Sequence, residues 1–96
     1  MRVWKVPCQI EHLPDFYVEE TSEDMYPVHV TGTPVQCKSI VYGVEHNSAR
    51  GRYSCDNEVY STREDAQKVA DKYNEQYQKE PLERDWRATV KVIPVL

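Results

Sequence analysis

The sequence predicts an α+β domain in which a small, bent antiparallel sheet of roughly four to six strands carries one main helix before its last strand. Two observations indicate this class. Short stretches with a period of two recur up to residue 60 and again after residue 86, and one long stretch of helical period covers about residues 62–79. With 96 residues, 40% of them hydrophobic, the chain has room for one modest core. We therefore predict a single domain over 1–96, with an SH3-like barrel as the first choice and a flatter sheet covered on one face as the second.

The N-terminal third predicts a strand followed by a long loop. Residues 2–8 alternate like a strand, and Pro7 removes a backbone donor, which favours an edge position. From residue 9 to residue 24 the period is lost, apart from a short extended piece at 16–18. Residues 26–30 restore the period of two, before a turn at 31–34.

The middle of the chain predicts an antiparallel meander. Residues 35–45 form the longest strand candidate, and its apolar face changes part way, so Gly43 is expected to permit a bulge or bend. The polar stretch 46–51 predicts a hairpin connection. Short strands at 52–55 and 58–60, joined by a tight turn at Asp56 and Asn57, follow it.

The helix over about 62–79 is the clearest local signal. Ser61 with Glu64 fits a capping box, and Thr62 with Asp65 offers the same arrangement one residue later. Pro81 predicts its end, because the residue before a proline is pushed out of the helical region. Five residues at helical spacing form its apolar stripe: Ala66, Val69, Ala70, Tyr73 and Tyr77.

A last strand is predicted from residue 86 to residue 93, and it continues into an apolar end at 94–96. Apolar side chains at a bare strand end favour aggregation if they stay exposed. The end is therefore expected either to complete the sheet or to pack against another copy of the chain, which makes a homodimer one alternative.

All of the excess negative charge lies in the first third of the chain. Residues 1–30 hold six acidic and two basic residues, whereas the remaining residues balance, and the net charge is −4. The acidic stretch 11–24 predicts either a solvated loop or a docking surface for a basic protein partner. Tyrosines flank it, and tyrosine is favoured at interfaces. The predicted partner-binding residues are Asp15, Tyr17, Glu19, Glu20, Glu23, Asp24 and Tyr26.

A nucleic-acid-binding barrel is the alternative function. The hairpin at 46–53 carries two arginines, a histidine and an aromatic residue, and small barrels bind single strands through such surfaces. An acidic chain with a pI near 5.3 argues against it, because contacts with phosphates dominate such binding. The residues of this alternative are His46, Arg50, Arg52 and Tyr53.

Catalysis, metals and cofactors are not expected. The three cysteines, Cys8, Cys37 and Cys55, lack a Cys-x-x-Cys spacing, and three is an odd number for a disulfide framework, so we expect reduced thiols. Cys8 and His12 are the only close Cys/His pair, and the three glycines do not cluster into a phosphate loop. No run of 18 apolar residues and no signal-peptide core occur, which predicts a cytoplasmic protein.

The segment from residue 40 to residue 77 carries one resemblance. Its order is strand, hairpin and short strand, and then Ser61-Thr62-Arg63-Glu64-Asp65-Ala66 opens a helix. This resembles small accessory proteins of phages and bacteria, in which an SH3-like meander is followed directly by such a helix. The resemblance implies a regulator or inhibitor that binds a host or defence protein, and it transfers no site residue. A structural domain with no separable activity is the remaining alternative.

Overall fold

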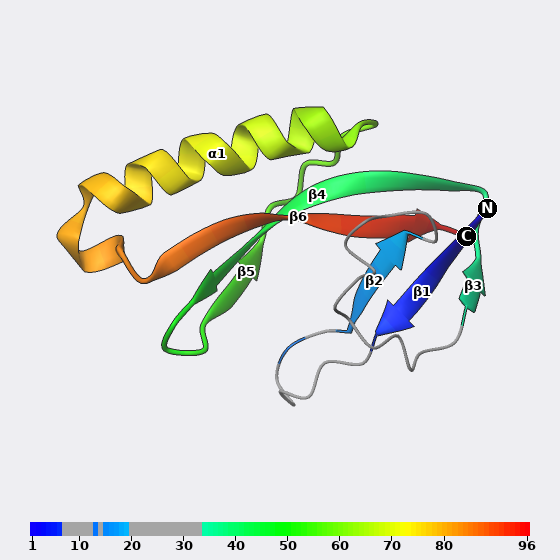
Figure 1. The fold of residues 1–96 in the computed structure, drawn as a ribbon, viewed down its shortest axis with the longest axis horizontal. Coiled ribbons are helices and arrows are strands. Elements are labelled where there is room, and N and C mark those ends of the chain that lie inside the picture. Colours follow the sequence, from blue (N-terminus) through cyan, green and yellow to red (C-terminus); the bar gives the residue numbers. More distant parts are fainter. Residues whose placement is uncertain (7–12, 14, 20–33) are drawn as a thin grey trace. The chain divides into compact units, whose positions relative to one another are not determined.

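The computed structural model describes residues 1–6, 13, 15–19 and 34–96, which form six strands, one α-helix and one short 3-10 helix (Figure 1). The α+β class is confirmed. The chain forms two compact units, Met1–Ile40 with Val92–Leu96, and Val41–Lys91. A single domain over 1–96 stays a prediction.

The first unit contains a three-stranded antiparallel sheet in the order β2-β1-β3. Its strands are β1 (Arg2–Val6), β2 (Phe16–Glu19) and β3 (Pro34–Gln36). The extended piece expected at 16–18 is thus confirmed. The edge position expected for the first strand is wrong, because β1 is the central strand. β1 covers Arg2–Val6, and Pro7 lies outside the described residues.

The strand expected over 35–45 is two strands in the structure. The chain leaves the first sheet after β3, passes through Cys37 and Lys38, and starts β4 (Ser39–Ser48). The Cys37 amide donates to the Met1 carbonyl at 2.9 Å, and the Lys38 amide donates to the Val95 carbonyl at 2.7 Å. The change of apolar face therefore occurs at this break. β4 continues through Gly43, which has no positive φ.

The second sheet is also three-stranded and antiparallel, with β4 between β5 (Tyr53–Cys55) and β6 (Trp86–Val95). A hairpin joins β4 to β5. Its turn uses Gly51 at a φ of 83°, in the region where glycine has no steric cost, and the Ser48 hydroxyl accepts from the Arg50 and Arg52 amides. The short strand expected at 58–60 is reduced to one bridge, between Tyr42 and Tyr60.

The helix α1 (Arg63–Lys79) matches the predicted range to within one residue. The Thr62 hydroxyl caps it by accepting from the Asp65 amide at 3.2 Å, so the second of the two predicted capping arrangements is the one formed. The helix ends at Lys79 with Glu80 as its C-cap, and a short 3-10 helix η2 (Pro81–Glu83) follows. Neither helix of the described residues has the length and apolar composition needed to cross a membrane.

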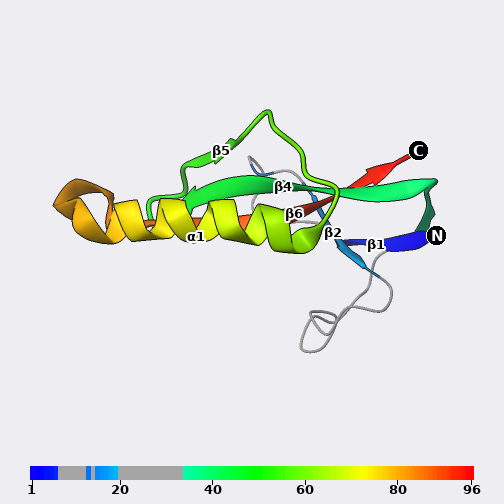
Figure 2. The ribbon, with the colours of Figure 1, turned by 90° about the horizontal axis from the view of Figure 1, so that it is seen from above.

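Helix α1 runs along one face of the second sheet (Figures 1 and 2), and the core of this unit lies between them. Its buried members are Val44, Ala66, Ala70 and Ala88, all at most 2% exposed. Alanines on the helix allow a close approach to the strands. The Asn74 amide group both accepts from the Ala88 amide and donates to its carbonyl, which fixes the helix to β6. Neither sheet closes on itself, so the SH3-like barrel is not confirmed.

Candidate functional site

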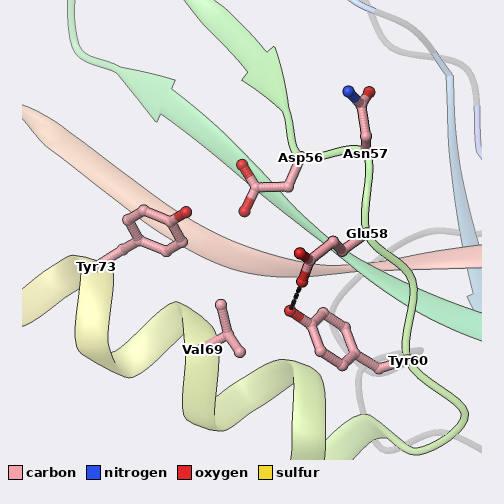
Figure 3. A pocket seen from close by; sticks show the side chains of 6 residues that line it. All are labelled: Asp56, Asn57, Glu58, Tyr60, Val69 and Tyr73. Carbon is pink, nitrogen blue, oxygen red and sulfur yellow. Dashed lines mark hydrogen bonds between the residues drawn. The ribbon is translucent and has the colours of Figure 1, made fainter.

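An open cavity of about 470 Å³ lies in the second unit, against the side of α1 (Figure 3). The segment that joins β5 to α1 supplies one wall, and α1 supplies the other. We call it the acidic cavity. Its lining residues are Asp56, Asn57, Glu58, Tyr60, Val69 and Tyr73.

Backbone pairing at two points shapes this cavity. The Asp56 amide donates to the Val44 carbonyl at 3.0 Å, which ties the start of the segment to β4. Tyr60 then pairs with Tyr42 through two backbone hydrogen bonds of 2.7 and 2.8 Å. Between these points the chain is free of the sheet, so Asn57 and Glu58 are exposed. Val69 and Tyr73 face them from α1 because residues four apart share one face of a helix.

A buried histidine holds one carboxylate of the cavity in place. His46 on β4 is only 4% exposed, and its Nε2 lies 3.1 Å from Asp56 Oδ1. Its Nδ1 lies 2.7 Å from the Tyr77 hydroxyl. An ionised carboxylate only accepts, so Nε2 is the ring nitrogen that donates to Asp56. In the neutral form of the ring, Nδ1 is then an acceptor for the Tyr77 hydroxyl. The Tyr73 ring packs edge-on against His46 with 4.6 Å between centroids.

The tyrosines of the cavity are held in the neutral form. The charge of Asp56 raises the pKa of Tyr73, and burial and a hydrogen bond to the same carboxylate raise it further. The hydrogen bond to Glu58, at 3.0 Å from the Tyr60 hydroxyl, raises the pKa of Tyr60. Outside the lining, burial and then the charge of Glu83 raise the pKa of Tyr77, the hydroxyl partner of His46. The cavity therefore presents carboxylates and neutral aromatic rings together.

This set of groups is suited to binding a cation. The six lining residues include two carboxylates and no lysine or arginine. Aromatic rings attract cations through their negative faces, and carboxylates accept charge-assisted hydrogen bonds. In the described part of the chain no three His, Cys, Asp or Glu side chains are grouped so that they could hold a metal ion.

The predicted acidic docking loop is described only in part. Asp15 lies 3.5 Å from the Lys5 ammonium, and Tyr17 and Glu19 lie on β2 and are half-buried. The other four members, Glu20, Glu23, Asp24 and Tyr26, lie outside the described residues. The docking role of this loop stays a prediction.

The structure separates the residues of the nucleic-acid alternative. His46 is buried against α1, whereas Arg50 and Arg52 are exposed near the hairpin turn. Arg50 lies 3.7 Å from Asp85. The Tyr53 hydroxyl donates to Glu45 at 3.0 Å and accepts from Lys91 at 3.2 Å. Only the two arginines remain as a pair on one exposed surface.

The described cysteines are both free thiols, as expected. Cys37 is buried and Cys55 is exposed. Cys8 and His12, the close pair in the sequence, lie outside the described residues.

Sequence reasoning missed the acidic cavity because it interpreted its residues one element at a time. Asp56 and Asn57 were expected to form a turn, and Tyr60 and Tyr73 look like core residues. One signal was available. Tyr42, Val44 and His46 alternate on one strand face, which places His46 on the same side as the core residue Val44.

Comparison with known proteins gives no assignment: no protein-family model matches the chain, and neither the curated proteins nor the solved structures contain a match.

Proposed function

We propose that this protein is a non-enzymatic binding module that holds a basic segment of a protein partner in the acidic cavity. One observation carries the proposal. Two carboxylates and two tyrosines line the same cavity, and none of its lining residues is basic. The net charge of −4 adds a weaker, long-range attraction for a basic partner.

Part of the cavity is preorganised, because two of its lining residues have fixed positions. Asp56 is held by the buried His46, and Tyr73 lies on α1, whose buried alanines pack it on the sheet. A preorganised site loses less conformational entropy on binding than a mobile one. Tyrosine contributes contact area while its hydroxyl stays available for hydrogen bonds. These properties favour a surface that binds a partner.

The resemblance to small phage and bacterial proteins extends this proposal to a biological role. In that role the protein acts in the cytoplasm as a regulator or inhibitor, and it occupies a basic surface that its target needs. The acidic loop at 11–24 is the second element of the proposal, because it extends the negative surface available to the partner.

Selection of peptides from a random library tests the proposed function without knowledge of the partner. The wild-type protein should enrich sequences rich in lysine or arginine. These peptides should bind Glu58→Gln poorly, because the cavity loses one of its two carboxylates while the amide oxygen can still accept from Tyr60. Glu75→Gln is the matched control, since it removes the same charge from an exposed position of α1 outside the cavity. The proposal is wrong if the enriched peptides carry no basic residues or bind both variants equally.

Single-stranded oligonucleotides form the second arm of this experiment. The alternative function predicts binding that weakens with salt and is lost on replacing Arg50 and Arg52 with alanine. Such a result, together with no enrichment of basic peptides, would replace the proposed function by the nucleic-acid alternative.

A further inference from the structure

We infer that the group that enters the acidic cavity is the guanidinium of an arginine side chain in an extended segment of the partner. The inference rests on the proposed function and narrows it to one residue type. It depends on the shape and chemistry of the lining, because long-range attraction to an acidic protein does not distinguish arginine from lysine.

The two carboxylates of the cavity, Asp56 and Glu58, lie at different places along its lining. Asp56 is fixed by His46 and lies near the Tyr73 hydroxyl, whereas Glu58 lies beside the Tyr60 hydroxyl (Figure 3). Arginine presents five N–H donors in a rigid planar fork, so it can meet separate acceptors at once. The ammonium of lysine is a compact and strongly hydrated point charge, and it satisfies such a set less well.

The remaining lining matches the rest of an arginine side chain. The rings of Tyr60 and Tyr73 line the cavity, and a planar guanidinium packs well against aromatic rings. Val69 lies between them on α1 and provides an apolar contact for the methylene stem (Figure 3). One side chain can therefore use the charged, aromatic and apolar parts of the lining together.

A peptide fits the cavity better than free arginine does. Asn57 and Glu58 are exposed at its rim, so a side chain can enter from outside while its backbone remains on the surface. Free arginine carries an α-carboxylate close to its side chain, and the Asp56 and Glu58 carboxylates would repel it. A peptide bond removes that charge.

Titration of the isotope-labelled full chain with short peptides tests the inference by NMR. The probes are capped pentapeptides of alanine with a central arginine, lysine or citrulline, and free L-arginine. The arginine peptide should shift the amide signals of Glu58, Tyr60, Val69 and Tyr73. Citrulline keeps the planar shape without the charge, and it should bind at least about tenfold more weakly, because hydrogen bonds to charged groups are the stronger ones.

Each outcome decides one point. Loss of the arginine-induced shifts in Glu58→Gln, with retention in Glu75→Gln, supports the inference. Equal binding of the lysine and arginine peptides overturns it and leaves the proposed function intact. If free L-arginine binds as tightly as the arginine peptide, the inference that the arginine belongs to a peptide segment is wrong. If no probe shifts these signals while library peptides still depend on Glu58, the inference fails and the proposed function stands.

Discussion

Removal of the Tyr77 hydroxyl should destabilise the protein, because that hydroxyl is the partner of a buried ring nitrogen. In the structure it lies 2.7 Å from Nδ1 of His46, which is only 4% exposed. Tyr77→Phe removes the donor and keeps the ring that packs near His46 and Trp86. The Nδ1 acceptor is then buried without a protein partner.

The expected cost is that of one unsatisfied buried acceptor, about 1–3 kcal/mol in the free energy of unfolding. For a chain of this size each kcal/mol lowers the melting temperature by roughly 4–8 °C. Tyr60→Phe provides the matched control. It deletes the same atom, but its partner Glu58 is exposed and can turn to water, so we expect a change within about 0.5 kcal/mol.

Urea unfolding of both variants, followed by circular dichroism at neutral pH, measures these values. Equal m-values would show that the two variants unfold from comparable states. If the two substitutions have the same effect, or if Tyr77→Phe is neutral, the Tyr77 hydroxyl does not hold His46 and the description of the cavity wall is wrong.

Three further predictions follow from the same contacts. The protein should lose stability as the pH rises above about 10, because tyrosines with raised pKa values stay protonated in the folded state while those of the unfolded chain ionise. The midpoint of urea unfolding, measured as a function of pH, tests this. A midpoint that does not change with pH would contradict it. The tyrosines concerned are Tyr53, Tyr60, Tyr73 and Tyr77. Neutral His46 should be the Nε2–H tautomer in imidazole nitrogen–proton correlation spectra, and signals of the Nδ1–H form would refute the donor roles assigned to Asp56 and Tyr77. Thr62→Ala should cost about 1 kcal/mol of stability and Ser61→Ala less than about 0.5, and the reverse order would assign the cap to Ser61.

Local signals in the sequence were enough to predict the helix. Its cap, its apolar stripe and the following Pro81 all lie within one short stretch, so the predicted and observed ranges agree to within one residue. The choice between Ser61 and Thr62 as the cap could not be made from the sequence, because both residues have an acidic residue three positions later.

The order of the strands in each sheet depends on contacts between residues that are distant in the sequence, so local patterns did not predict it. The position of β1 between β2 and β3 is set by pairing with residues 16–19 and 34–36, which no local pattern in residues 2–6 encodes. β4 also extends to Ser48, three residues beyond the predicted end at residue 45. Its polar end looks like a loop in the sequence because β4 buries His46 rather than an apolar residue there.

The acidic cavity combines residues that are unremarkable where they stand in the sequence. Asp56 is predicted to lie in a turn and Glu58 at the start of a short strand, whereas Val69 and Tyr73 belong to the apolar stripe of α1. Only the return of the chain to β4 at Tyr60 sets the two groups against each other. The sequence predicts a short strand at 58–60, but it does not show that this segment pairs with β4 through the single bridge between Tyr42 and Tyr60.

The affinity of a library-selected basic peptide for three forms of the protein decides whether the acidic cavity is the binding site. Isothermal titration calorimetry gives the dissociation constant of the peptide for the wild type, Glu58→Gln and Glu75→Gln. The two variants have the same net charge, so a difference between them reports the position of the charge. If the acidic cavity is the binding site, Glu58→Gln should weaken binding at least about tenfold, whereas Glu75→Gln should stay within about twofold. Equal losses in the two variants would show that the peptide responds to overall charge, and they would contradict the assignment of the cavity as the site.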